Sequence, residues 1–305
     1  MAGAASHNSR LPIMVAIFVI GLIIPLIVNA GAIRLSVYRI VLLVLFFPAL
    51  FKLLSNSVGR IRLPDIAILV ICIWSALSIL VIQGPLVETI GILIIETMGS
   101  YLIGRCYIRT PDQFFKMCRL FFFIILIIFP MALFESLTGR ELVLEIFNVV
   151  GTVYPASNME QRMGLYRAQG PFAHPIHFGL FFGAFIGLAF YVVGYGSQAF
   201  SRLWRTAIVA ATGALALSSG PLTALVAQVY MIIWDRALNK IKARWYILGF
   251  LTILAYFVID ILSNRNPFQV FISYLAFNAD TAYNRIYIWI YGTASIFNNP
   301  LWGVG

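Results

Sequence analysis

Two histidines and an arginine lie close together between Arg167 and Gly179, the part of the chain best suited to chemistry. His174 and His177 are two of only three histidines, and each could act as a general base or donate a hydrogen bond to a phosphate. Histidines three residues apart could also share a metal ion, but no third ligand is convincing, so we expect no metal. Pro175 suits the first position of a helix, so a structural capping role for His174 is an equal alternative.

Three arginines, Arg162, Arg167 and Arg285, are candidates for binding phosphate. A guanidinium group presents a fixed fork of donors that matches phosphate or carboxylate oxygens. The alternative for each arginine is a side chain that reaches lipid phosphates or pairs with a nearby glutamate. We favour ligand binding for Arg167 and Arg285, because each adjoins a distinctive motif.

Glycines recur at every fourth position directly after the histidines, at Gly179, Gly183 and Gly187. This spacing places them on one face of a helix, where small residues let two membrane helices approach closely. We therefore expect this stripe to pack the helix that carries His177 against a neighbour.

The composition sets the class of protein that must hold these residues in place. Of 305 residues, 61% are hydrophobic and only 10% are charged, against about 25% charged in soluble domains. Repeated long apolar runs predict an all-α polytopic integral membrane protein. The net charge of +10 is best explained by basic cytoplasmic loops, so we expect no nucleic-acid partner. The three cysteines lack metal-ligand spacing and are interpreted as small apolar residues.

About nine transmembrane helices are predicted. The first is expected to be an uncleaved span rather than a signal peptide. The seventh and eighth form a short hairpin within 206–235, turning at residues 218–221, because both of its flanks are basic. The expected spans are 11–29, 35–51, 64–82, 86–104, 118–135, 176–195, 206–218, 221–235 and 245–262.

The distribution of basic residues predicts the orientation of the chain. With the N-terminus in the cytoplasm, 14 of the 21 basic residues fall inside and six outside, with Arg39 within a span. Both longer polar segments then lie on the outer face. The chain divides into N-terminal helices at 1–135, a periplasmic loop at 136–175, further helices at 176–262 and a second periplasmic segment at 263–305.

Two further features leave alternatives open. Glu96 and Arg39 are ionisable residues within predicted spans, where a charge should face protein or water. They could pair with each other, or they could line an ion path. The alternation of isoleucine and tyrosine after Arg285 fits a strand, and an aromatic helix at the membrane surface fits equally well.

Three features together resemble the O-antigen ligase and polysaccharide polymerase superfamily. They are the Arg167-x-x-Gly170-x-Phe172-x-His174-Pro175 stretch, the small polar turn at Leu217–Gly220, and Arg285-x-x-x-Trp289 followed by Pro300-x-x-Gly303-x-Gly305. The similarity covers roughly residues 120–305. The family usually has an arginine after the turn serine, where this chain has Gly220. It also continues beyond Gly-x-Gly, so this chain resembles a C-terminally truncated member.

This resemblance implies a metal-independent glycosyltransferase in the bacterial inner membrane. Such an enzyme transfers glycan from an undecaprenyl-pyrophosphate carrier at the periplasmic face and needs no cofactor. Arg167 and Arg285 would hold the pyrophosphate, and a basic group would activate the acceptor hydroxyl. Partners would be the lipid-linked glycan, the lipid bilayer and other polysaccharide-assembly membrane proteins. The alternatives are a transporter of a lipid-linked or amphiphilic solute and a non-catalytic partner in assembly.

Overall fold

The computed structural model describes residues 10–31, 33–157, 160–275 and 279–304, and it is 71% helical. Within these ranges, six helices are long and apolar enough to cross a membrane. The structure therefore agrees with an all-α multi-pass membrane protein, whereas the predicted count of nine spans is not confirmed. The six are Val37–Leu54, Leu63–Gln83, Val87–Tyr107, Pro111–Thr138, Pro175–Val193 and Arg244–Leu262.

The three predicted spans outside this set are shorter or more polar. Helix α1 (Ile13–Gly21) has 9 residues, a length of about 14 Å against a hydrocarbon core about 30 Å thick. Helix α10 (Ala199–Ala214) has 16 residues. Helix α11 (Ser219–Ala237) has 19 residues, but Gln228 in its middle and charged residues at its end reduce its apolar character.

The end of the predicted first span, from residue 27, belongs to a β-hairpin instead of a helix. Strand β1 (Ile27–Ala30) pairs antiparallel with β2 (Ile33–Ser36). Pro25 has no N–H to continue the helix, and the β-branched residues after it favour a strand. The Ile27 N–H donates to the Thr152 carbonyl at 2.8 Å, so this hairpin is attached to the long loop that precedes Pro175.

The remaining elements are helical, and two of them are short π-helical segments inside longer helices. They are α2 (Val37–Leu54), α3 (Leu63–Gln83), α4 (Val87–Ile94), the π segment η1 (Ile95–Gly99), α5 (Ser100–Tyr107), α6 (Pro111–Thr138), α7 (Leu142–Asn148), α8 (Pro175–Gly183), α9 (Ile186–Leu188), the π segment η2 (Ala189–Val193), α12 (Arg244–Leu262), α13 (Pro267–Leu275) and α14 (Ala279–Asn298).

Helix α6 begins at Pro111, earlier than the predicted residue 118. The Gln113 N–H donates to the Thr110 hydroxyl at 3.2 Å, and the Gln113 side chain accepts from the Thr110 N–H at 3.3 Å. This reciprocal capping box satisfies the first backbone donors of the helix. The helix can therefore start in a polar sequence that apolar periodicity alone does not include.

Helices α6, α8 and α10 pack together at the centre of the molecule. Their contact is made by fully buried side chains, among them Ile125, Phe178, Phe182 and Val209. All three cysteines are buried and free, in agreement with their interpretation as small apolar residues. The tightly packed helices α6, α8 and α10 therefore hold the loops attached to them in fixed positions.

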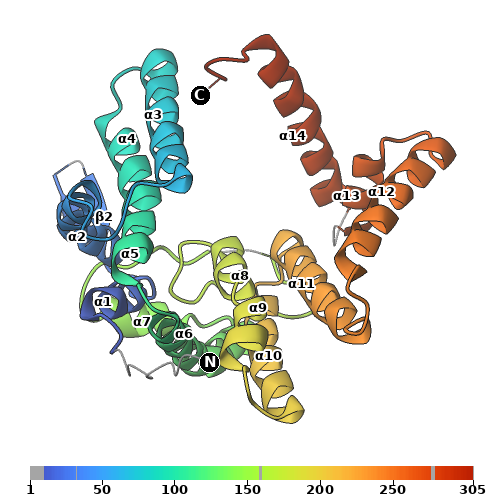
Figure 1. Cartoon of the computed structure of the whole chain (residues 1–305), viewed down its shortest axis with the longest axis horizontal. Helices are drawn as coiled ribbons and strands as arrows, with labels where there is room; N and C mark the ends of the chain where they lie inside the picture. Colours follow the sequence, from blue (N-terminus) through green and yellow to red (C-terminus); the bar gives the residue numbers. More distant parts are fainter. Residues whose placement is uncertain (1–9, 32, 158–159, 276–278, 305) are drawn as a thin grey trace.

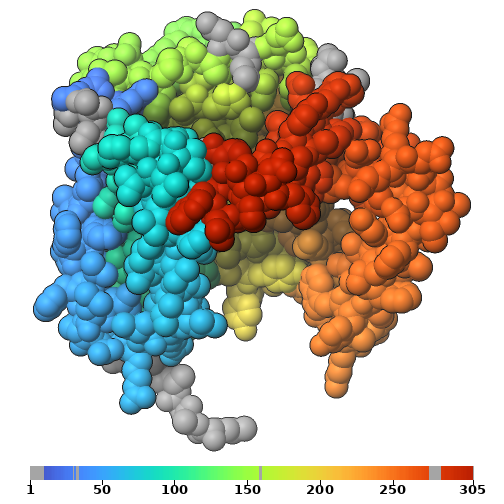
Figure 2. All heavy atoms as spheres, turned by 90° about the horizontal axis from the view of Figure 1, so that it is seen from above, coloured from blue at the N-terminus to red at the C-terminus, as the bar shows by residue number. Residues whose placement is uncertain are grey.

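The chain forms an open arc, with α6, α8 and α10 at its base (Figure 1). Helices α2 to α5 form one side and α12 to α14 the other, and α14 runs back toward α3. The Trp302 ring stacks on that of Trp74 in α3, with centroids 5.2 Å apart and planes inclined by 8°. Figure 2 shows α14 lying across the face of the molecule between α3 and α12.

The segment after Arg285 is helical, which resolves the choice between strand and helix. Tyr283, Tyr287 and Tyr291 recur every fourth residue, and their rings stand next to one another with centroids 4.4 and 5.7 Å apart. The alternation of isoleucine and tyrosine thus also contains a helical period, and the helical period is the one realised.

Candidate functional site

The segment Tyr166–Gly170 is held between the end of α6 and the turn that joins α10 to α11. The Tyr166 N–H donates to the Ser136 carbonyl at 2.9 Å, and the Ser136 hydroxyl donates to the Tyr166 carbonyl at 2.8 Å. On the other side, the Ala168 N–H donates to the Leu215 carbonyl at 3.0 Å. Backbone contacts on both sides therefore fix the chain around Arg167. We call the end of the molecule that carries residues 139–174 the loop face.

A buried glutamate attaches the same segment to α6. Glu135 is only 2% exposed, and its carboxylate accepts the N–H groups of Gln169 at 2.7 Å and Gly170 at 3.1 Å. Among the described residues, the partners of this carboxylate are backbone donors rather than a cation. Glu135 therefore acts as a positioning residue for the loop.

The Gln169 side chain joins separate parts of the loop to one another. Its carbonyl oxygen accepts the Ser157 N–H at 2.6 Å, and its amide nitrogen donates to the carbonyls of Pro155 at 3.2 Å and Phe172 at 3.1 Å. Gly170 has a φ of +52°, and a Cβ there would lie 2.8 Å from the Phe178 ring. The close approach of loop and α8 thus requires glycine at this position.

The three arginines predicted from the sequence meet at the α10–α11 turn. Arg162 Nη1 donates to the Leu217 carbonyl at 2.9 Å, and Arg167 Nε contacts the Ala216 carbonyl at 3.4 Å. Arg285, from the distant helix α14, donates from Nη2 to the Ser219 hydroxyl at 2.6 Å. We call this group the arginine cluster: Arg162, Arg167 and Arg285 around turn residues 216–219.

Local backbone geometry positions two parts of the arginine cluster. Arg162 precedes a tight turn in which Met163 and Gly164 have φ values of +55° and +77°, as a type I′ hairpin requires. The Arg162 N–H and the Leu165 carbonyl close that turn at 2.9 Å. On the facing side, Leu217 also has a positive φ, +44°, directly before the N-terminus of α11.

The cluster is strongly electropositive. Burial lowers the pKa of the Arg167 guanidinium, and the neighbouring positive charge of Arg162 lowers it further. The backbone N–H groups of a helix N-terminus add partial positive charge in the same place, here at Ser219. Like charges brought together in this way favour binding of an anion with several oxygens, such as a pyrophosphate.

The two histidines face different surroundings. His174 caps α8, with Nδ1 accepting the Ile176 N–H at 3.0 Å, so the neutral ring carries its proton on Nε2 and can donate from there. Burial lowers the pKa of His174, and the charge of Arg167 lowers it further. His177 is exposed, 6.1 Å away between ring centroids, and lines a separate cavity. The contacts of His174 fit a cap and a donor better than a base.

Acidification is expected to weaken the start of α8. Because the folded-state pKa of His174 lies below its usual 6.5, the unfolded chain gains a proton at higher pH than the folded chain. The stability that this site contributes is therefore complete above about pH 6.5 and is lost as the pH falls below it. Thermal unfolding in detergent from pH 8 to pH 5 measures this change. The His174→Asn variant, which can cap without titrating, should lose this part of the pH dependence. An unchanged profile would contradict the assignment.

The cavity beside His177 has a volume of about 520 Å³ and lies between the loop and the helices α1, α2 and η1. Arg39 and Glu96, whose pairing was one of two open alternatives, form an ion pair there at 2.7 Å. The Tyr38 hydroxyl donates to the same carboxylate at 2.5 Å. Glu96 lies in the π segment η1, a kind of irregularity common at functional sites.

The glycine stripe is not a uniform packing face. A Cβ on Gly179 would lie 2.7 Å from Pro221, so α8 and the α10–α11 turn are in close contact there. A Cβ on Gly183 would meet nothing within 4 Å, although a Cβ on Gly213 of α10 would lie 3.2 Å from the Gly183 nitrogen. At Gly187 the nearest atom would be 3.9 Å away.

Three residues of the site were not identified from the sequence: Glu135, Gln169 and Ser219. Glu135 is a polar side chain near the end of an apolar run and Gln169 lies in the loop before α8, and burial is the signal that distinguishes both from other polar residues. Ser219 directly precedes Gly220, a turn position that carries no arginine in this chain. The guanidinium group beside Ser219 comes from Arg285 instead. Within the described ranges, no group of three or more His, Cys, Asp or Glu side chains is placed to hold a metal ion.

The chain matches no protein-family model, no curated protein and no solved structure. The function is therefore inferred from the geometry of the arginine cluster and its surroundings.

Proposed function

We propose that this protein is a surface-polysaccharide polymerase or ligase that transfers glycan from a polyprenyl-pyrophosphate carrier. The observation that carries the proposal is the meeting of Arg162, Arg167 and Arg285 at one turn, from two distant parts of the chain, the loop before α8 and helix α14. Three guanidinium groups held around one turn repel one another, which makes the turn attractive to an anion. A doubly charged leaving group, such as undecaprenyl pyrophosphate, would offset this repulsion.

The proposed reaction is an exchange of bonds at one sugar carbon. The oxygen of an acceptor hydroxyl bonds to the anomeric carbon of the donor glycan, and the bond to the pyrophosphate oxygen breaks with its electron pair. The arginine cluster stabilises the charge that develops on the departing pyrophosphate. The hydroxyl proton passes to a basic group, and the cap made by His174 Nδ1 leaves that role to another side chain.

The proposal includes an orientation in the bacterial inner membrane. The loop face would lie on the periplasmic side and the N-terminus in the cytoplasm, in keeping with the positions of the basic residues. Helix α1 and the α10–α11 pair would then accompany the six longer helices as the remaining segments of a nine-segment topology. The α10–α11 turn would stay below the outer surface, where protein can satisfy its backbone.

The test is polymer lengthening in cells that depend on this protein. Arg167→Ala and Arg285→Ala are each expected to reduce it by about 100-fold or more, the usual effect of removing one donor to a developing charge. Arg→Lys at either site should rescue poorly, because an ammonium group lacks the planar fork. Arg265, an exposed arginine between α12 and α13, gives the matched control Arg265→Ala.

Membrane insertion should be the same in all of these variants. Wild-type chain-length distributions in both Arg167→Ala and Arg285→Ala would overturn the proposal, as would an equal loss in Arg265→Ala.

A second candidate function, transport of a lipid-linked or amphiphilic solute, is favoured by one observation. The cavity of about 520 Å³ is lined by the half-buried Arg39–Glu96 ion pair, and ionisable residues within membrane segments often mark a solute path. Transport would be supported if the wild-type protein carries such a solute across the membrane of proteoliposomes and the Glu96→Gln variant does not. Unchanged polymer lengthening in that same variant would separate the two functions.

A further inference from the structure

A narrow apolar groove lies between the start of α2 and α4, away from the arginine cluster. Its volume is about 220 Å³, room for roughly seven groups the size of a water molecule or a methylene. No residue of α4 is buried, so its side chains remain accessible from outside the molecule. The apolar walls of the groove are Leu35, Leu43, Val87, Ile92 and Ile95.

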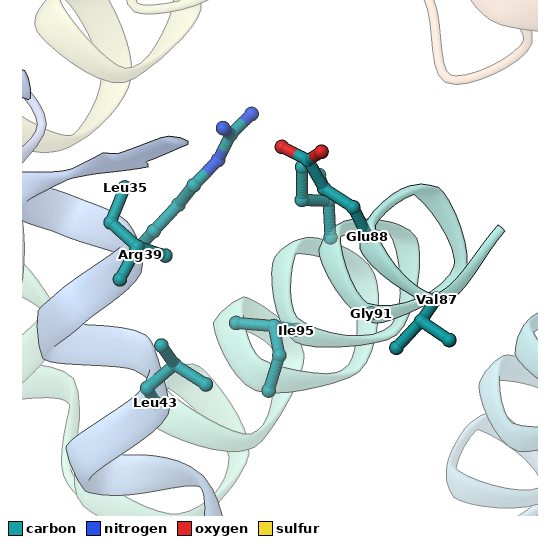
Figure 3. Close-up of a pocket in the computed structure, with 8 residues that line it drawn as sticks. Leu35, Arg39, Leu43, Val87, Glu88, Gly91 and Ile95 are labelled. Atoms are coloured by element: carbon teal, nitrogen blue, oxygen red, sulfur yellow. The ribbon is translucent and has the colours of Figure 1, made fainter. Parts of the chain in front are cut away.

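Two opposite charges stand at the mouth of this groove. Figure 3 shows the Arg39 guanidinium and the Glu88 carboxylate pointing toward one another from α2 and α4. Both residues are in the first turn of their helices, at the same end of the membrane-crossing segments. The ion pair of Arg39 is nevertheless with Glu96, at 2.7 Å. Glu88 accepts only the Arg34 N–H at 3.3 Å, among the contacts in the described chain.

We infer that this groove binds one acyl chain of a glycerophospholipid whose headgroup is zwitterionic, with a phosphate followed by a primary ammonium. The phosphate would contact Arg39, and the ammonium would contact Glu88. The position of both charges in the first helical turn corresponds to the headgroup level of a bilayer, with the apolar walls below it. This lipid site is independent of the proposed glycosyltransferase function.

Charge and size select this occupant over others. An anionic headgroup would bring its phosphate to Arg39 but would leave Glu88 facing a second negative or neutral group. A helix of another protein copy, about 10 Å across with its side chains, does not fit a groove of this volume. Gly91 lies in the groove, and its missing side chain provides part of the space for the chain.

The expected selectivity is modest because the lipid competes with other lipids. An acyl chain gains little apolar burial on leaving a bilayer that is equally apolar, so the headgroup contacts decide the preference. An exposed ion pair corresponds to about a two- to fivefold change in binding. We therefore expect a preference of this size, which native mass spectrometry can resolve.

The experiment uses the full chain, purified in detergent and mixed with equal amounts of phosphatidylethanolamine and phosphatidylglycerol. Native mass spectrometry should find the wild-type protein bound to phosphatidylethanolamine about two to five times more often. Glu88→Gln keeps an acceptor oxygen for the Arg34 N–H and should abolish this preference. Equal binding of the two lipids to the wild type, or an unchanged preference in Glu88→Gln, would overturn the inference.

A groove-filling variant tests the place of binding. A Cβ on Gly91 would meet nothing within 4 Å, so Gly91→Leu fills the groove without a clash and favours the helix. It should lower the amount of bound phosphatidylethanolamine to that of phosphatidylglycerol, because a lipid excluded from the groove cannot bring its headgroup to Arg39 and Glu88. Gly249→Leu is the matched control, because Gly249 lies in α12, where a Cβ also meets nothing within 4 Å. Equal binding of phosphatidylethanolamine by Gly91→Leu and Gly249→Leu would overturn the inference. A protein dimer that Gly91→Leu dissociates and Gly249→Leu does not would also overturn it, because a second copy would then occupy the groove.

Discussion

Replacing Glu135 with alanine is expected to destabilise the protein and to abolish the proposed activity, although every arginine of the cluster remains. The change removes the acceptor from two buried backbone donors, the N–H groups of Gln169 and Gly170. Each buried donor without a partner costs about 1–3 kcal/mol, so the free energy of unfolding should fall by roughly 2–6 kcal/mol. Relief of the buried carboxylate offsets part of this cost.

The loss should also displace Arg167, which is two residues before Gln169. A shift of about 1 Å in a group that positions substrate can reduce a rate by about 100-fold. Glu135→Gln retains one acceptor oxygen at the same place and should recover part of the stability and part of the activity. Glu145→Ala is the matched control, because Glu145 is 45% exposed and pairs with Arg140 on the surface.

Unfolding in detergent, hydrogen exchange at the amides of residues 169 and 170, and polymer lengthening together measure this prediction. Exchange at the two amides should increase in Glu135→Ala and stay unchanged in Glu145→Ala. If Glu135→Ala matched the control in all three measurements, Glu135 would have no role in positioning the loop.

Six of the predicted spans correspond closely to helices in the structure, because a long apolar run has few other ways to satisfy its backbone in a membrane. The segment after Pro25 is the clearest difference. It is as apolar as a helix would be, so a hydropathy window includes it in the first span. Local features separate it from that span: a proline without a donor, β-branched residues and Gly31 with a φ of +63°.

The orientation predicted from the basic residues puts Arg167 and Arg285 on the same side of the membrane, but the sequence contains no information about the distance between them. Arg167 contacts Ala216 and Arg285 contacts Ser219, so the two arginines meet at one turn only because the chain returns to α11 after α12. The role of Glu135 in anchoring the loop could not be predicted from the sequence for a similar reason. A glutamate near the end of an apolar run has the same appearance in sequence whether it is buried or faces water.

The glycine stripe shows how spacing can predict one contact and miss others. Regular α-helix would place Gly179, Gly183 and Gly187 on one face. In the structure α8 ends at Gly183, and the short helix α9 and the π segment η2 come after it. This break in the regular α-helical period means that the three glycines do not share one neighbour.

Gly179→Ala is expected to destabilise the protein, whereas Gly183→Ala four residues later is not. The new Cβ at position 179 would lie 2.7 Å from the Pro221 Cβ and 2.8 Å from the Ala216 Cβ. Both atoms are attached directly to backbone, so α8 or the turn has to move. Such overpacking costs about 1–3 kcal/mol, and alanine's better helix propensity recovers up to about 1 kcal/mol. At Gly183 only the propensity gain applies, because a Cβ there meets nothing within 4 Å.

The displaced turn is the one that accepts hydrogen bonds from the arginine cluster, through residues 216, 217 and 219. Gly179→Ala should therefore lower the unfolding midpoint and polymer lengthening together, and Gly183→Ala should lower neither. Equal midpoints for the two variants would show that the turn adapts without cost. Loss of stability in Gly179→Ala with normal lengthening would show that the close packing of α8 holds the fold but does not position the arginines.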